Sequence, residues 1–528
     1  MCRSGFRRAG TPVFVSAEPW PGTLPVGPRR SGASGPVPRC RKGEEMIPNS
    51  RAARIRRALV LGGAALGVVS LVAGCVRPVA GTGAAEHWSA TRVAGLEITT
   101  GASGPRAGVA DSRLPVAGSD GGEADRLARN AVDDVQRYWA EELPASFGRR
   151  FEPVARLVSY DSTGPGVAIC GTGTGGAVNA FYCPADDTVA WDRAQLLPML
   201  NDSFGPMAVV AVLAHELGHA VQSRLGTVDG RTSSIVREQQ ADCFAGNFIR
   251  WVAEGNAPHF QLSTGPGLNQ ILATLFFIRD GAETGFEADG AHGNAFDRVS
   301  AFQFGFGDGP GRCARIDEAE VRRRITQPAG GQLSSSGRET GDLPVNDRES
   351  LLALQETLRA AFDRGGTAGP TISPSLSACP EVTVTAPAAY CPATDTVGLD
   401  LAELARLGTS PGQGQGGIGD FAAFAEVASR YALAAQHADG FPLTGLATAQ
   451  RTACLTGVWA ATIVAGRGAV LQLSPGDLDE AVAEMLAPRS LIAADVNGAG
   501  IPSGFARVEA FRDGFTSGAP SPCLEKYR

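Results

Sequence analysis

The chain has 528 residues, 43% of them hydrophobic and 19% charged, a balance that predicts globular structure in two or three domains and excludes disorder throughout. Residues 1–60 carry twelve Lys and Arg against three Asp and Glu, a local charge of +9, so the remaining residues account for −16 of a net −7. An acidic body argues against nucleic acid as the main partner.

The N-terminal segment has the features of an export signal. Residues 1–45, rich in Pro, Gly and Arg, are expected to be a mis-called start or an unstructured leader. From Met46 a basic stretch precedes an apolar run and small residues that lead to Cys75, as in a bacterial lipobox. We therefore expect residues 46–75 to be a lipoprotein signal peptide, with Cys75 lipidated and the protein exported and anchored to the outer face of the cell membrane. A simple transmembrane anchor is the alternative, although the apolar run is short for a span.

The next two segments differ in pattern. Residues 76–122 are rich in Gly, Ala and Ser and predict a flexible tether. The periodic apolar residues of Glu123–Leu143 predict an amphipathic helix, and Asn346–Phe362 repeats the pattern later in the chain.

A metal-binding pattern lies in the segment Pro206–Leu225. This segment has no internal Pro and is followed by a Gly, so it predicts a buried helix. His215 and His219 lie one turn apart on one face of that helix, where both imidazoles can reach one metal ion. Glu216 is placed to contact a water molecule on that metal. In a chain with six His, the chance expectation of this spacing is well under about one percent.

A third ligand is available on a second predicted helix. Glu238 follows His219 by nineteen residues, within VREQQADCFAGNFIRW, and shares a helix face with Asp242. Glu238 is the natural third ligand, and Asp242 can accept the free N–H of His215 or His219. The alternative is that both carboxylates are solvated helix charges.

These motifs carry a resemblance. HExxH followed by ExxxD resembles the gluzincins, and the set AFYCP, AHELGHAVQ, EQQADCFAG and HGNAFDR is similar to the neutral zinc metallopeptidase family of bacteria, over roughly residues 125–315. The resemblance implies a zincin-like α+β domain. It also implies Zn²⁺ held by His215, His219 and Glu238, with Glu216 as catalytic base.

The expected mechanism is hydrolysis of peptide bonds by metal-activated water, with Glu216 taking the proton and passing it to the leaving amine. His292, in the HGNAFDR motif of the resemblance, is the candidate donor to the oxyanion, although a lone histidine is more often structural. AFYCPADDTVAWD predicts a strand ending in a turn, and in zincins an edge strand near the metal pairs with extended substrate. Tyr182 in this stretch recurs as Tyr390, which favours a structural role.

Several motifs recur 208 to 211 residues later. AFYCPADDTVAWD returns as AAYCPATDTVGLD, ADCFAGNFIRW as TACLTGVWAAT, and RVSAFQFGF as RVEAFRDGF. We infer a tandem duplication: a metallopeptidase domain over residues 123–315, a linker over 316–344, and a degenerate copy over 345–528.

Eight cysteines follow the signal, and an even number in an exported protein implies disulfides. Symmetry between the copies predicts four pairs: Cys170 with Cys183, Cys243 with Cys313, Cys379 with Cys391, and Cys454 with Cys523. Cys243 lies near Glu238 and is alternatively a soft zinc ligand. The equivalent Cys454 argues against this, because it persists where no ligand survives.

The second copy lacks the metal-binding residues. Alignment places residues 429–433 opposite HELGH, and Ala449 and Ala453 opposite Glu238 and Asp242. We expect this copy to fold without this chemistry and to pack on the first copy, shape its cleft or bind a partner.

Two functions remain. The first is a lipid-anchored zinc metallopeptidase that acts on peptide or protein substrates in the cell envelope. The alternative is a non-catalytic envelope binding or scaffold lipoprotein with a structural metal. Glu216 favours the first, because a structural zinc site has no need of a carboxylate beside an open coordination position.

Overall fold

The computed structural model describes residues 89–281, 284–285, 288, 290–324, 343–362, 369–409, 417–466 and 471–528. The predicted leader, the signal peptide with Cys75 and residues 76–88 of the predicted tether lie outside them. None of the helices in these ranges combines the length and the apolar character that a membrane span requires. We call the described residues up to 324 the first half and those from 343 the second half.

The first half contains a three-stranded sheet. Its order is β4 (Arg156–Tyr160), β8 (Thr188–Asp192) and β7 (Ala180–Cys183), with β4 parallel and β7 antiparallel to β8. All five residues of the central strand β8 are buried. The stretch expected to be one strand with a turn is therefore a hairpin of two strands, in which Asp187 takes a φ of 46°. Its first strand, β7, is the edge of the sheet.

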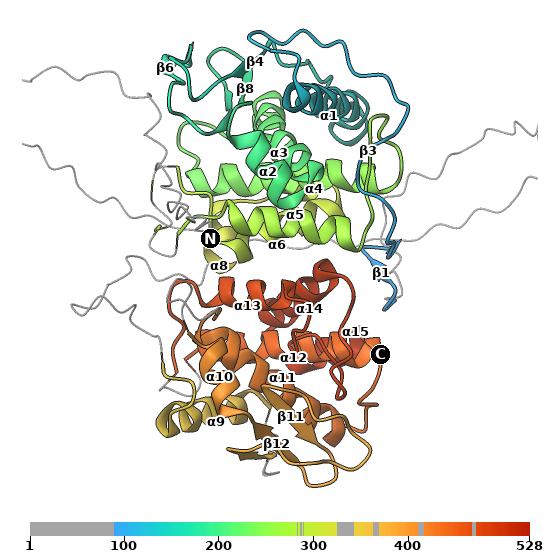
Figure 1. Cartoon of the computed structure of the whole chain (residues 1–528), viewed down its shortest axis with the longest axis vertical. Helices are drawn as coiled ribbons and strands as arrows, with labels where there is room; N and C mark the ends of the chain where they lie inside the picture. Colours follow the sequence, from blue (N-terminus) through green and yellow to red (C-terminus); the bar gives the residue numbers. More distant parts are fainter. Residues whose placement is uncertain are drawn as a thin grey trace, which may run out of the picture. The chain divides into compact units, whose positions relative to one another are not determined.

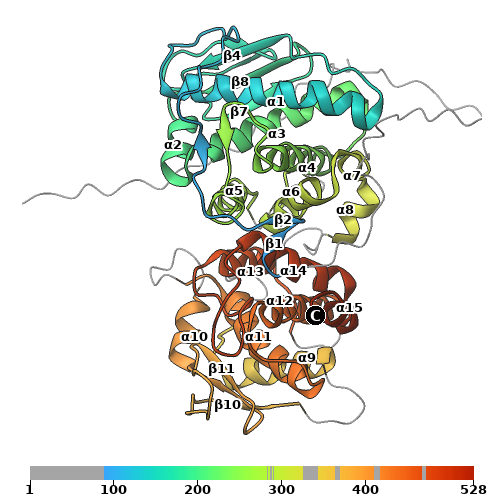
Figure 2. The same ribbon diagram turned by 90° about the vertical axis from the view of Figure 1, so that its right-hand side faces the viewer.

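Long helices pack beneath this sheet and carry most of the core. α3 (Pro206–Leu225) has the predicted bounds, with Pro at its start and Gly226 in the left-handed conformation at its end. It packs against α1 (Glu123–Phe147), α4 (Ser234–Ala253) and β7, and α4 in turn packs against α6 (Ala295–Asp308) (Figures 1 and 2). Mixed helices and small sheets make this an α+β fold.

The contact between α4 and α6 depends on two glycines. A Cβ on Gly246 would lie 2.0 Å from the carbonyl oxygen of Phe302, and one on Gly305 would lie 1.7 Å from that of Cys243. The two helices therefore approach at backbone distance, which only glycine permits. The apolar motifs that recur along the chain are thus packing motifs.

Two predicted connections are more ordered than expected. Within the tether, residues 89–122 form β1 (Arg92–Val93), β2 (Leu96–Glu97) and β3 (Gly104–Pro105), so the prediction of a flexible tether is wrong for these residues. β3 pairs with β9 (Phe260–Gln261), which supplies the hydrogen bonds that a free tether would lack. Part of the predicted linker is also helical, as α8 (Glu318–Arg324).

The remaining elements of the first half are short. They are β5 (Ala168–Ile169), β6 (Thr172–Gly173), α2 (Leu196–Phe204), α5 (Pro266–Phe277), α7 (Pro310–Cys313) and α8 (Glu318–Arg324).

The second half presents a similar order of elements. Its sheet has the order β10 (Thr371–Ser373), β12 (Thr396–Leu399) and β11 (Ala388–Cys391), with β10 parallel and β11 antiparallel to β12, as in the first half. Two glycines again allow close helix contact, because Cβ atoms on Gly457 and Gly514 would lie 2.0 and 1.7 Å from carbonyl oxygens. The elements are α9 (Arg348–Phe362), β10 (Thr371–Ser373), β11 (Ala388–Cys391), β12 (Thr396–Leu399), α10 (Leu401–Leu407), α11 (Asp420–Ala438), α12 (Leu446–Val464), α13 (Asp477–Leu486), α14 (Gly504–Ser517) and α15 (Pro520–Lys526).

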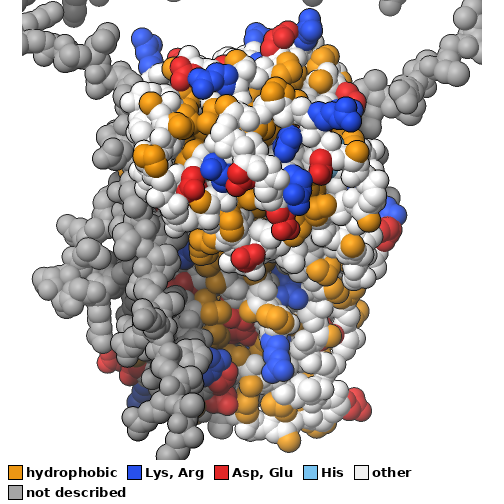
Figure 3. All heavy atoms as spheres, turned by 45° about the horizontal axis from the view of Figure 1, so that its top comes forward, with side chains coloured by type: hydrophobic (Ala, Val, Ile, Leu, Met, Phe, Trp, Pro, Cys, Tyr) orange, Lys and Arg blue, Asp and Glu red, His pale blue; other side chains and the backbone are white. Residues whose placement is uncertain are grey.

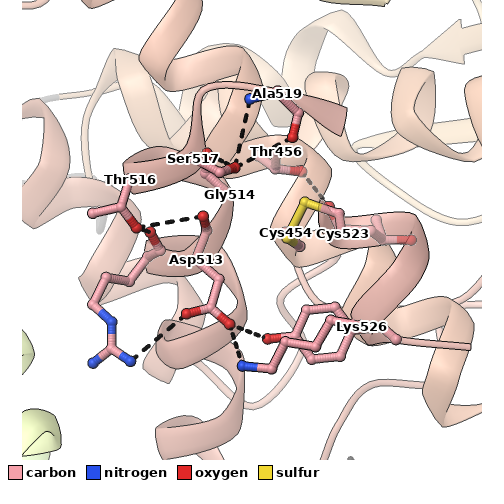
Figure 4. Close-up of a disulfide and its surroundings, with 12 residues drawn as sticks. Cys454, Thr456, Asp513, Gly514, Thr516, Ser517, Ala519, Cys523 and Lys526 are labelled. Atoms are coloured by element: carbon pink, nitrogen blue, oxygen red, sulfur yellow. Dashed lines mark hydrogen bonds and ion pairs between the residues drawn. A yellow bond between two sulfur atoms is a disulfide. The ribbon is translucent and has the colours of Figure 1, made fainter. Parts of the chain in front are cut away.

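The structure contains the four predicted disulfides. Each half closes one short loop in its sheet region and one long loop between helices. Figure 4 shows the bond between Cys454 on α12 and Cys523 on α15, beside the ion pair of Lys526 with Asp513. The pairing of Cys243 with Cys313 removes the alternative that Cys243 is a zinc ligand.

Charges of both signs are mixed on the face shown in Figure 3. Basic and acidic side chains lie beside one another there, with apolar side chains between them. A face of this kind has no extended field of one sign to steer a charged polymer.

Candidate metal centre

Two buried helices bring the predicted ligands together. His215 and His219 come from α3, and their Nε2 atoms lie 3.0 and 3.3 Å from Oε2 of Glu238 on α4. The three ligand atoms all lie within 4.8 Å of one another. Gly218 permits this approach, since a Cβ there would lie 2.9 Å from the carbonyl oxygen of Ala241 on α4.

These residues fit a zinc ion. Tetrahedral zinc with bonds near 2.0–2.1 Å places neighbouring ligand atoms roughly 3.3 Å apart, close to the separations found between the histidine nitrogens and Glu238. Burial acts to raise the pKa of Glu238, but the neighbouring histidines outweigh it and hold this pKa well below its usual value. The carboxylate is therefore ionised, as a metal ligand must be.

Asp242 orients His215. Its Oδ1 lies 2.7 Å from Nδ1 of His215, and Arg298 donates to both of its oxygens at 2.9 Å. Burial favours a raised pKa for Asp242, but the charges of Arg298 and His215 bring it to about 2. An ionised Asp242 keeps the imidazole proton on Nδ1 of His215. The Nε2 atom is then unprotonated, and its lone pair is available to bind a metal ion. The sequence predicted Asp242 in this role for one of the two histidines, and the structure selects His215.

His219 is oriented by a residue that the sequence analysis missed. Its Nδ1 lies 3.0 Å from Oε1 of Gln222, whose Nε2 donates to the carbonyl oxygen of Arg237 at 2.6 Å. Because the amide nitrogen faces a carbonyl, the amide oxygen faces the imidazole, and Nδ1 is the donor. The spacing of three residues on one helix face was the available signal for Gln222.

Glu216 faces the same space from beside the ligands. It is 8% exposed, and its Oε2 accepts a hydrogen bond of 3.1 Å from the backbone N–H of Tyr182 on edge strand β7. Burial raises the pKa of Glu216, against the opposing effect of His215 and His219. The phenol of Tyr182 points elsewhere, to Asp187 at 2.9 Å, as a structural residue would.

His292 reaches the centre from the segment before α6. Its Nε2 lies 3.7 Å from Oε2 of Glu238, and its side chain is 36% exposed. Asp280, which the sequence analysis did not identify, lies 3.3 Å from Nδ1 of His292. Asp280 also accepts the backbone N–H groups of His292 and Gly293 at 2.6 and 2.8 Å. The structure thus brings His292 next to the ligands without making it one of the three clustered groups.

The corresponding place in the second half is filled. Arg430, aligned with Glu216, is 0% exposed and donates to the carbonyl oxygens of Leu491, Ala494 and Asp495 at 2.7 to 2.9 Å. Ala449 and Ala453, aligned with Glu238 and Asp242, are fully buried. Arg507, aligned with Arg298, donates to the backbone carbonyl oxygens of Ile501, Met485 and Ala487.

The donor set defines the class of site: two imidazoles and one carboxylate, with a further carboxylate beside them, match the ligand set of a mononuclear zinc centre of the hydrolase type. A family model described as "Putative neutral zinc metallopeptidase" matches residues 61–313. An uncharacterized protein of Mycobacterium tuberculosis is 31% identical over 232 residues, which are 38% of this chain and 75% of the relative. Uncharacterized protein YpfJ of Escherichia coli is 30% identical over 140 residues, 24% of this chain and 47% of the relative. No solved structure gives a significant match. The chain belongs to the neutral zinc metallopeptidase family.

Proposed function

We propose that the first half is an active zinc peptidase that hydrolyses peptide bonds. The observation that carries the proposal is the convergence of His215, His219 and Glu238 on one point, with the carboxylate of Glu216 beside it. A metal held only for structure would need neither an adjacent buried carboxylate nor an open side.

The residues of the centre divide the chemistry between them. When bound, zinc supplies Lewis acidity, which lowers the pKa of water and polarises a carbonyl group. Glu216 takes a proton from the attacking water and returns it to the leaving nitrogen. Its burial-raised pKa makes the Glu216 carboxylate a stronger base, as a group that must take a proton from water requires. His292, held by Asp280, donates to the oxyanion that forms on the substrate.

Substrate binding is proposed along β7. This strand is the edge of its sheet, and its Tyr182 N–H already contacts Glu216. An extended peptide added beside β7 would gain main-chain hydrogen bonds and would pass in front of the metal ligands. Recognition through backbone atoms gives affinity with little dependence on substrate sequence.

The rest of the chain is proposed to serve this activity in the cell envelope. Cys75 would carry the lipid anchor of an exported protein, and the four disulfides suit an oxidising compartment. The similar element order and helix contacts of the two halves support a tandem duplication, with the domain of residues 123–315 active and that of 345–528 degenerate.

Glu216→Gln tests the proposal, because it removes the base and keeps the shape of the side chain. We expect wild type and this variant each to bind one zinc ion per chain, and only wild type to cleave a peptide library. His219→Ala is the control that should lose zinc. The contrary result is that wild type binds zinc but cleaves no peptide beyond those that the Glu216 variant also cleaves. The protein would then be an envelope scaffold with a structural metal.

A further inference from the structure

We propose that Asp479, in the second half, is a positioning residue for His292 in the first half, an inference that rests on the peptidase function proposed above. The degenerate half would then be a working part of the active site. It would act by holding the segment that carries His292, and would supply no group to the substrate.

Asp479 contacts the chain on both sides of that segment. Nε of Arg279 donates to its Oδ2 at 2.8 Å, and the backbone N–H of Phe296 lies 3.3 Å from its Oδ1. Arg279 directly precedes Asp280, and Phe296 lies in the first turn of α6, four residues after His292. Asp479 is 5% exposed, so this carboxylate is buried at the contact. A carboxylate shared by a guanidinium and the N-terminus of a helix forms strong, directional bonds.

The anchored residues lead directly to the imidazole. Asp280 accepts the N–H groups of His292 and Gly293, and its own N–H donates to the carbonyl oxygen of Gly293 at 3.1 Å. Its other oxygen faces Nδ1 of the His292 ring. Asp280 therefore sets both the backbone and the ring of His292, and Asp479 holds the residue next to Asp280. Displacement of Arg279 would be transmitted to the imidazole through one peptide unit.

Another hydrogen bond between the halves does not lead to the segment that carries His292. The backbone N–H of Gly504, at the start of α14, donates to Oδ1 of Asn269 at 2.7 Å. This bond also joins a side chain of one half to a helix N-terminus of the other, but Asn269 lies on α5, ten residues before Arg279. Asn269→Ala is therefore the matched control for Asp479→Ala.

The experiment compares both variants with wild type in zinc content, in kcat and KM on one peptide, and in hydrogen exchange of the His292 and Gly293 amides. For Asp479→Ala we expect faster exchange at these amides and a kcat lower by roughly ten- to a hundredfold, with KM and zinc content near wild type. Asn269→Ala should change thermal stability only. If Asp479→Ala does not fold, Asp479→Asn, which removes the charge facing Arg279, is measured instead.

Two outcomes would overturn the proposal. One is wild-type exchange and kcat in the Asp479 variant, and the other is an equal loss of kcat in the Asn269 variant, which would make the second half a general support. If wild type itself cleaves no peptide, the proposed function fails. The exchange measurement still decides whether Asp479 holds the His292 segment.

Discussion

Replacement of Asp242 by Asn should weaken both the fold of the first half and its hold on zinc. The Asp242 carboxylate has 0% exposure and accepts from His215 and twice from Arg298. An Asn side chain keeps one acceptor oxygen, but its N–H₂ group would face a hydrogen-bond donor of His215 or Arg298. The guanidinium of Arg298, 2% exposed, would then be left buried without the carboxylate to which it donates.

The expected magnitudes follow from these contacts. Removing one partner of a buried ion pair costs about 3–5 kcal/mol, and we expect the lower end because Asn retains one acceptor. Loss of the carboxylate behind a ligating histidine lowers metal affinity by roughly 10- to 100-fold, or about 1.4–2.8 kcal/mol. With Arg298→Leu added, the double variant should lose less than the sum of the single losses, because the stranded charge is gone.

Urea unfolding in the presence of a chelator measures the first effect, and zinc titration of the folded protein measures the second. The chelator matters because bound zinc itself adds stability to the folded state. A loss below about 1 kcal/mol together with unchanged zinc affinity would refute the role assigned to Asp242.

Two further predictions concern burial and the disulfides. Burial raises the pKa of Asp297 to about 7, so the folded chain holds a proton between about pH 4 and 7 that the unfolded chain has released. The free energy of unfolding should therefore fall as pH rises through this window, by at most about 4 kcal/mol. Urea midpoints at pH 5 and 8 should differ less in Asp297→Asn, and an equal difference in both proteins would contradict the assignment. Replacing Cys243 and Cys313 together by Ala should cost about 4 kcal/mol of stability, because their bond closes a long loop. Zinc content should stay at one per chain, whereas loss of zinc from a folded variant would reinstate Cys243 as a ligand.

The parts of the site that the sequence predicted are those encoded locally. His215 and His219 share a face because a helix repeats every 3.6 residues, and the bounds of α3 follow from Pro206 and Gly226. The disulfides were predictable because each pair of cysteines in the first half recurs at a similar spacing in the second half. The helical period and the recurrence of motifs along the chain therefore account for most of the correct predictions about the site and the disulfides.

The parts that were missed depend on contacts far apart in sequence. Arg298 meets Asp242 across 56 residues, and nothing near either residue marks the pairing. The segment of residues 89–122 has the composition of a tether, yet β3 finds its partner in β9, over 150 residues away. The sequence predicts one strand where the structure has the β7-β8 hairpin, because the turn at Asp187 has none of the glycines that usually mark one.

Under the proposed duplication, Arg430 would make a loss of catalysis in the second half difficult to reverse. Returning a glutamate to this position would aim a carboxylate at three carbonyl oxygens and would leave all three without the donors that now satisfy them. A substitution that restored the base would therefore cost stability whether or not the metal ligands had returned. In evolutionary terms, the buried guanidinium of Arg430 would oppose reversion, so the second half could diverge as the proposed support for the first half but would not readily regain catalysis.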